Sequence, residues 1–257
     1  MSTNEALLKV AGVSISFGGL RALNDVHLQL NSDEVVGLIG PNGAGKTTAF
    51  NAICGLVTPD SGTISFDGQE RSWPRTDELV DLGISRTLQG VGLFPDLTVL
   101  ENVMIGAQRF AKSGLLSASF GTNTKDERQL EDRAMHALER VYASTLANRR
   151  ASTLSYPDTK RVAIARAIVS EPKILMLDEP AGGLGSQDIE WLNGFIRNIK
   201  ATMSVLIVEH HMDVVMSVCD RLYVLNFGEV ISSGTSEQVR RDPAVIAAYL
   251  GTSAGSA

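Results

Sequence analysis

The stretch GPNGAGKTT occupies residues 40–48 and decides the fold class. It matches the pattern G-x-x-x-x-G-K-[ST] and follows the apolar run 35–39, so it is expected to join a buried strand to a helix. The glycines let successive backbone N–H groups converge on one anion, and the helix adds its own free N–H groups and its dipole. Lys46 is expected to reach the β- and γ-phosphates of a nucleotide, and the Thr47 hydroxyl is expected to bind Mg²⁺. The predicted nucleotide-binding residues of this loop are Gly40, Pro41, Asn42, Gly43, Ala44, Gly45, Lys46, Thr47 and Thr48.

The composition predicts a globular protein, because 44% of the 257 residues are hydrophobic. The formal net charge of −6 argues against nucleic acid as the main partner. Cys54 and Cys219 are far apart in apolar surroundings and are expected to be reduced core thiols. The sequence shows neither a signal peptide nor an apolar run of about 18 residues, so membrane attachment is expected only through a partner.

Asp178 and Glu179 directly follow the apolar run 174–177. An aspartate in this position can hold Mg²⁺, and the next carboxylate can polarise a water for attack on a γ-phosphate. Two solvated carboxylates would look the same, but the phosphate loop in the same chain favours the catalytic interpretation. His210 and Gln89 are ambiguous by themselves, because each is equally consistent with a structural role.

Hydrophobic patterning predicts the order of the elements. Strands with alternating apolar residues are expected near residues 13–17, 26–30 and 63–66, and buried parallel strands at 174–177 and 205–208, with a closing hairpin at 222–231. Helices are expected at 98–110, opened by a capping box of Thr98 and Glu101, and at 125–147, 155–170 and 188–200. The Ser- and Gly-rich stretch 112–124 is expected to be a loop.

The order of these motifs resembles that of the nucleotide-binding subunit of an ABC transporter over nearly the whole chain. In this resemblance residues 40–48 are the Walker A motif, 174–178 the Walker B motif, and 183–185 the D-loop. The resemblance implies ATP and Mg²⁺ as cofactors. It assigns adenine stacking to Phe17, metal binding to Thr47, Gln89 and Asp178, catalysis to Glu179, His210 and Gln89, and a signature that faces the ATP of a partner to Leu154, Ser155, Tyr156, Pro157 and Asp158.

The resemblance can be narrowed to the ATPase subunits of branched-chain amino acid importers. Four segments carry this narrower similarity: 17–23, 93–103, 208–212 and 246–251. The long stretch between Gln89 and the signature is similar to the larger of the two ATPases in such systems. Two positions depart from the family pattern, because Pro157 stands where the family usually has glycine, and Gly185 where the D-loop usually has an acidic or amide residue.

The expected fold is α/β, with a P-loop NTPase core, an N-terminal antiparallel β region and an α-helical subdomain at about 90–170. One ABC-type nucleotide-binding domain would cover 6–251, and a short tail would cover 252–257. The expected function is ATP hydrolysis at the cytoplasmic face of the membrane, which powers uptake of branched-chain or similar amino acids. The implied partners are a second ATPase subunit in a heterodimer, a transmembrane permease, which Phe94 and Leu97 are candidates to contact, and indirectly an extracytoplasmic solute-binding protein.

Two alternatives stay open at this stage. The chain could power a different ABC system, such as lipid or polysaccharide export, because the ATPase is shared while other subunits select the cargo. It could also be a nucleotide-binding assembly subunit that hydrolyses ATP weakly, which Pro157 and Gly185 favour and intact Glu179 and His210 oppose.

Overall fold

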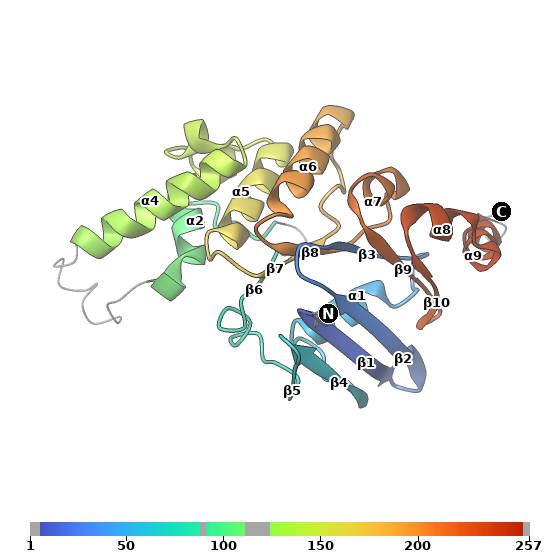
Figure 1. The fold of residues 1–257 in the computed structure, drawn as a ribbon. Helices are drawn as coiled ribbons and strands as arrows, with labels where there is room; N and C mark the ends of the chain where they lie inside the picture. The colour runs from blue at the N-terminus through green and yellow to red at the C-terminus, as the bar shows by residue number, and fades with distance from the viewer. Residues whose placement is uncertain (1–5, 88–90, 111–123, 254–257) are drawn as a thin grey trace.

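A computed structural model describes residues 6–87, 91–110 and 124–253. Two sheets form the framework (Figure 1). The antiparallel sheet has the order β2-β1-β4-β5, with bounds Leu20–Leu30, Leu8–Phe17, Ser61–Phe66 and Gln69–Arg71. The second sheet has the order β10-β9-β3-β8-β7-β6, with bounds Glu229–Gly234, Arg221–Asn226, Val35–Ile39, Ser204–Val208, Ile174–Asp178 and Ile84–Arg86. Its strands are parallel except for β10, which pairs antiparallel with β9.

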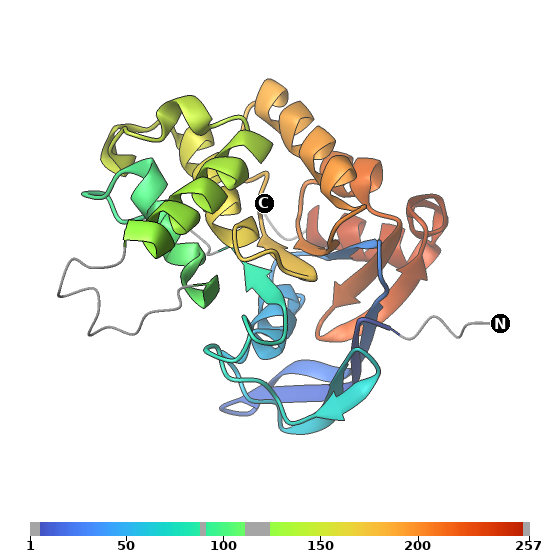
Figure 2. The same cartoon turned by 60° about the vertical axis from the view of Figure 1, so that its left-hand side comes forward.

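Helices pack around these sheets. Their bounds are α1 Lys46–Ile53, α2 Val99–Gly106, α4 Thr124–Arg140, α5 Tyr156–Ile168, α6 Ser186–Ile199, α7 Met212–Val218, α8 Ser236–Arg241 and α9 Pro243–Ser253. Figure 2 shows α2, α4 and α5 gathered beyond the β6 end of the larger sheet, while α8 and α9 lie near β9 and β10 at the opposite end. This arrangement confirms the predicted α/β P-loop class with its N-terminal antiparallel region.

Helix α1 lies between the two sheets. Its Phe50 is fully buried in one core cluster with Leu8 of β1 and Leu38 of β3. Strand β7 is covered on both faces, because Met176 belongs to this cluster while Leu175 packs with the helices on the other face. Burial on both faces is why β3, β7 and β8 are continuous apolar runs rather than alternating ones.

The predicted helix at 125–147 is too long at its C-terminal end, because α4 ends at Arg140. Tyr142 adopts a left-handed φ of 57°, and the N–H of Ala143 donates to the carbonyl of Leu138, which closes the helix end. A short 3-10 turn, Ser144–Leu146, continues the chain. Val141 is fully buried after the helix has ended, so the apolar pattern outlasts the helix.

The other predicted elements appear, although β1 begins five residues and β2 six residues before the predicted strands. Helix α2 has the predicted capping box, in which the Thr98 hydroxyl accepts from the N–H of Glu101 and the Glu101 carboxylate accepts from the N–H of Thr98. Both cysteines are free thiols. The loop predicted at 112–124 lies almost entirely outside the described residues. Among the residues that the structure describes, no helix combines the length and apolarity needed to cross a bilayer.

Candidate functional site

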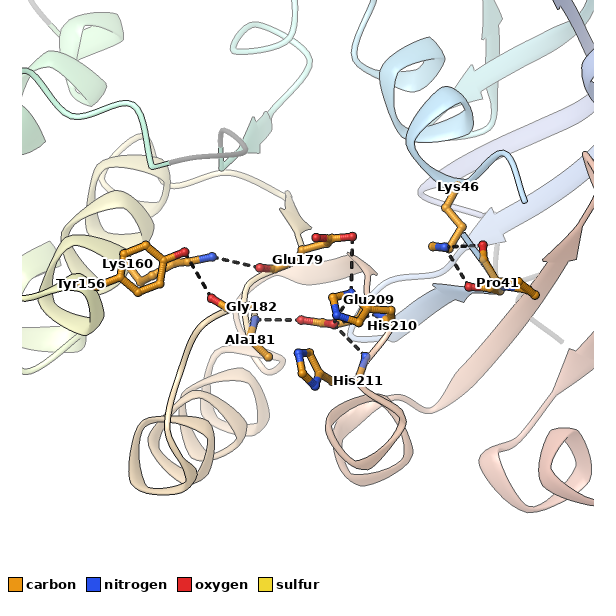
Figure 3. A network of polar contacts seen from close by, with 11 residues as sticks. Pro41, Lys46, Tyr156, Lys160, Glu179, Ala181, Gly182, Glu209, His210 and His211 are labelled. Carbon is orange, nitrogen blue, oxygen red and sulfur yellow. Dashed lines mark hydrogen bonds and ion pairs between the residues drawn. The ribbon is translucent and has the colours of Figure 1, made fainter. Parts of the chain in front are cut away.

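The site forms where three neighbouring parallel strands end. Strand β8 lies between β3 and β7 in the sheet, and all three run in the same direction. The segments that follow them therefore meet at one edge: the phosphate loop after β3, Asp178 and Glu179 at the end of β7, and Glu209 with His210 after β8. Figure 3 shows His210 and Glu209 between Lys46 on one side and Glu179 on the other. Ligands of open α/β sheets bind at such edges.

Two glycines determine the path of the phosphate loop. Gly40 has a φ of 152°, and a Cβ at this position would lie 2.1 Å from the carbonyl oxygen of Leu225. Gly45 has a left-handed φ of 102°, and its Cβ would lie 2.6 Å from the carbonyl oxygen of Ala22. Any larger residue at either position would displace the loop from β9 or β2. No side chain caps α1 at Gly45, so the helix N-terminus faces the loop without a protein anion.

The Lys46 side chain lies inside this loop. Its Nζ donates to the carbonyl oxygens of Gly40, at 2.8 Å, and Pro41, at 2.9 Å. Burial lowers the pKa of Lys46, and the negative charges of Glu179 and Glu209 oppose that shift. The neighbouring Thr47 side chain is exposed. The lysine is thus a buried cation beside an open helix N-terminus, an arrangement that suits the oxygens of a polyphosphate.

Asp178 provides a buried carboxylate at the end of β7. Its backbone N–H donates to the Thr87 hydroxyl at 3.3 Å. Burial raises the pKa of Asp178, and the adjacent negative charge of Glu179 raises it further. Because carboxylates gather at this edge, a divalent cation fits the donor set, and the Asp178 carboxylate and the Thr47 hydroxyl are oxygen ligands of the kind that Mg²⁺ prefers. Gln89, predicted to share this role, lies outside the described residues.

The backbone of Glu179 adopts a conformation that is unusual for a non-glycine residue. Its φ is 45°, in the left-handed region, which costs about 1–3 kcal/mol and concentrates at functional sites. Its N–H donates to the carbonyl of Val208 at 2.8 Å, and its carbonyl accepts from Lys160 Nζ at 3.0 Å. The carboxylate Oε1 lies 3.4 Å from Nδ1 of His210. The structure therefore brings these two predicted catalytic residues together, although 31 positions separate them in the chain.

Glu209 is a site residue to which the sequence analysis assigned no role. Its side chain is 0% exposed, and its carboxylate accepts from the backbone N–H groups of Ala181 at 2.8 Å, His210 at 2.8 Å and His211 at 3.0 Å. These bonds tie the segment after β7 to the segment after β8. A buried carboxylate is stable here because three donors satisfy it. The sequence pattern that could have identified Glu209 is an acidic residue directly after a buried apolar strand, the same pattern that identified Asp178 and Glu179.

The predicted signature lies at the N-terminus of α5. Ser155 is the N-cap and accepts from the N–H of Asp158 at 3.3 Å, while the Ser155 hydroxyl donates to the Asp158 carboxylate at 2.7 Å. Pro157 occupies the first turn of the helix. The Tyr156 hydroxyl donates to the carbonyl of Gly182 at 3.2 Å, and a Cβ on Gly183 would lie 2.7 Å from the Tyr156 ring. The signature therefore packs directly on the segment that follows Glu179 (Figure 3).

The remaining candidate, Phe17, ends strand β1 and is half exposed. It pairs with Leu20 across the turn Gly18–Gly19. The following strand, β2, contributes the Ala22 carbonyl that approaches Gly45, so Phe17 belongs to a hairpin that contacts the phosphate loop. An exposed aromatic ring in this position offers a flat surface for stacking.

Comparisons of the chain with known proteins all point to the same family. A family model described as ABC transporter matches residues 23–182, and one described as branched-chain amino acid ATP-binding cassette transporter matches residues 229–255. The chain is 43% identical to the high-affinity branched-chain amino acid transport ATP-binding protein LivG of Escherichia coli (strain K12), over 96% of this chain and 99% of that protein. It is 41% identical to the corresponding protein BraF of Pseudomonas aeruginosa, over 95% of this chain and 98% of that protein.

Solved structures agree with this assignment. A crystal structure of an ATP-binding cassette of an ABC transporter in its ADP conformation superposes with a TM-score of 0.83 and 32% identity, over 96% of this chain and 99% of that one. A dimeric ATP-binding cassette in a post-hydrolysis state, bound to ADP and phosphate, gives a TM-score of 0.75 and 27% identity, over 89% of this chain and 98% of that one. The chain therefore belongs to the ABC transporter family, as an ATP-hydrolysing cassette of the branched-chain amino acid transporter type.

Proposed function

We propose that this chain hydrolyses ATP to power uptake of branched-chain or similar amino acids through a membrane permease. The observation that carries the proposal is the meeting of Lys46, Glu179 and His210 at the ends of three adjacent parallel strands. The named activity of LivG and BraF, which this chain matches over nearly its full length, supports the choice of cargo.

Each site residue has a proposed role in this reaction. Lys46 and the loop amides bind the β- and γ-phosphates, and Phe17 stacks on adenine. Thr47 and Asp178, with Gln89, would hold Mg²⁺, which when bound neutralises phosphate charge. Glu179 accepts the proton of the attacking water as general base, and His210 orients that water and the γ-phosphate. The 3.4 Å separation of Glu179 Oε1 and His210 Nδ1 leaves both groups able to contact one water.

The proposed assembly contains two ATPase chains that enclose two ATP molecules. In each composite site, one chain's phosphate loop faces the signature of the other, which for this chain is Leu154 to Asp158. The dimeric cassette that binds ADP and phosphate supports such a pairing. We propose a second, different ATPase chain as the partner, because Pro157 has no N–H and makes this chain's own signature an incomplete phosphate binder.

Docking to a permease is proposed through the segment around Phe94, which would place the chain at the cytoplasmic face of the membrane. The Phe94 side chain is 51% exposed. Its backbone N–H and carbonyl are both bonded to the buried Asn102 amide, at 2.8 Å and 3.0 Å. This clamp presents an apolar ring on a fixed stretch of backbone, which suits contact with another protein.

The test is reconstitution of the chain with its second ATPase and permease in proteoliposomes that enclose ATP. Leucine, isoleucine or valine presented with the solute-binding protein should accumulate inside only when ATP is hydrolysed. Lys46→Ala, with the partner's site silenced, should abolish both activities because the phosphate-binding cation is lost. Hydrolysis that is coupled to lipid or polysaccharide movement instead would assign a different ABC system, and binding without turnover would assign an assembly role.

A further inference from the structure

We infer that Glu209, His210 and His211 form an inhibitory transition-metal site, and that Zn²⁺ is the ion it takes. These three residues follow β8, and their potential ligand atoms lie within 4.8 Å of one another. Within the part of the chain that the structure describes, no other group of three or more His, Cys, Asp and Glu side chains meets this condition. Metal binding needs only these residues, whereas its inhibitory effect rests on the ATPase function proposed above.

The turn after β8 brings the two imidazoles to the same side. Consecutive side chains in a strand point to opposite faces, but the rings of His210 and His211 are 4.4 Å apart between centroids, with planes inclined by 36°. The turn is held by the Glu209 carboxylate, which accepts from the N–H groups of both histidines. The backbone that presents the two rings is therefore fixed by a third potential ligand (Figure 3).

Small ring rotations would convert this cluster into a zinc site. Zinc binds imidazole nitrogen and carboxylate oxygen at about 2.0–2.2 Å, so tetrahedral ligand atoms lie about 3.3 Å apart. Nδ1 of His210 lies 3.7 Å from Oε2 of Glu209. The His210 side chain is 44% exposed and can rotate without disturbing the core. Oε1 of Glu209 accepts only from the Ala181 N–H and keeps one lone pair for a metal, whereas Oε2 already accepts from both histidine N–H groups.

The local charge and the ligand type both favour a borderline-soft cation. Three carboxylates, from Asp178, Glu179 and Glu209, lie at this edge, and the nearby cation Lys46 is already bonded to two loop carbonyls. Imidazole ligands select Zn²⁺ over Mg²⁺, which prefers oxygen. The two cations would thus occupy separate places, Mg²⁺ beside Thr47 and Asp178 and Zn²⁺ beside His210.

Zinc bound here would block the reaction through His210. Zinc on Nδ1 would hold the His210 ring in the orientation that the metal requires rather than the one that serves the γ-phosphate and the attacking water. Glu179 would also be drawn toward the metal, because its Oε1 lies 3.4 Å from His210 Nδ1. His211 caps α7 without a side-chain hydrogen bond and has no role in the proposed reaction. It is therefore the residue whose replacement separates metal binding from catalysis.

The test is calorimetric titration of Zn²⁺ into the tag-free full chain without nucleotide. One ion should bind per chain, and His211→Asn should weaken binding at least about tenfold, because even loss of an outer-shell partner costs metal sites 10- to 100-fold. Asparagine is a favourable N-cap and should preserve α7. His136→Asn, on the exposed face of α4, is the matched control and should bind zinc like the parent. Unchanged affinity in His211→Asn, or equal losses in both variants, would overturn the site.

A second measurement does not depend on any variant folding. Zinc should shift the imidazole NMR signals of two histidines in the parent chain and leave those of His27 and His136 in place. In the assembled transporter, zinc should inhibit ATP hydrolysis by the parent and spare His211→Asn, whose turnover without zinc should equal that of the parent. If the complex hydrolyses no ATP, the proposed function fails while the calorimetry still decides the site; zinc binding without inhibition would overturn the inhibitory role.

Discussion

The N-termini of α1 and α5 are both expected to contact phosphate, but they are built differently. No side chain caps α1 at Gly45, and Lys46 adds a buried cation. In α5, by contrast, the Ser155 hydroxyl donates to the Asp158 carboxylate and accepts from the Asp158 N–H. Pro157, in the first turn of this helix, contributes no N–H. One helix end is open to an anion, whereas the other uses the Ser155 hydroxyl and the Asp158 N–H within the chain.

This difference teaches that a helix N-terminus is an anion site only when its donors are left free. In the proposed dimer the two ends would belong to different composite sites, because this chain's loop would face the partner's signature. We therefore expect unequal sites, with the more active one at this chain's own phosphate loop. Gly185, which caps α6 without a side-chain bond, would weaken the other site further.

Glu179→Gln should produce the largest effect and tests the inequality directly. The amide keeps the shape of the carboxylate but cannot accept a proton, and a general base contributes about 10²–10⁴-fold to turnover. In the reconstituted complex this variant should lose most ATPase activity and still bind ATP. The equivalent change in the partner subunit should cost much less. Equal losses, the reverse order, or a homodimer that works at full rate would contradict the inequality.

Asp178→Asn should lower turnover by at least about tenfold, because it removes a ligand proposed for Mg²⁺. It should at the same time stabilise the isolated chain. The folded-state pKa of Asp178 is raised by burial and by Glu179, so the folded state binds the proton more tightly than the unfolded state does. The parent's free energy of unfolding should therefore fall as the pH rises from the ordinary aspartate pKa to the raised one.

The measurement for Asp178→Asn is urea unfolding of both chains across this acidic range, without nucleotide. The stability advantage of the variant should grow with pH and then level off above the raised pKa. A parent chain whose stability increases more steeply with pH than that of the variant would mean that the carboxylate is stabilising, contrary to the burial argument.

Pro157→Gly should restore one N–H to the signature and strengthen the partner's composite site about tenfold. A charge-assisted hydrogen bond contributes about 1.5–3 kcal/mol, which sets the upper range of this gain. The readout is the ATP affinity of the partner's site in the closed dimer. Pro157→Ala is the matched control, since it restores the N–H but adds a Cβ. If neither variant gains affinity, the proline acts only by stabilising the first turn of α5.

Thr98→Ala should have the smallest effect and calibrates the comparison. Helix α2 is closed by a complete capping box and is assigned no phosphate role. Loss of this cap should reduce the free energy of unfolding by about 1 kcal/mol and leave ATP turnover per folded chain unchanged. A clear fall in ATP affinity would show that helix caps act on the site through global stability, which would undermine the interpretation of the α5 variants.

The sequence by itself determined the elements whose causes are local. The phosphate loop follows from glycine spacing and the preceding apolar run, and the strands β3, β7 and β8 follow from their continuous burial. The capping box of α2 was predicted because its two partners are three residues apart. The end of α4 was placed seven residues too late, because buried Val141 continues the apolar pattern after the helix stops.

Only the tertiary structure decided the contacts between distant segments. Glu209 became a site residue because Ala181, 28 positions away, donates to its carboxylate, and no periodicity reports such a bond. The pairing of Glu179 with His210 required the strand order β3-β8-β7, which the chain order does not specify. Whether the Ser155 hydroxyl is free for a phosphate or used within the chain depends on its bond to the Asp158 carboxylate. Burial and hydrogen bonding of this kind arise from neighbours in space, and the physical reason is that packing, not chain order, selects those neighbours.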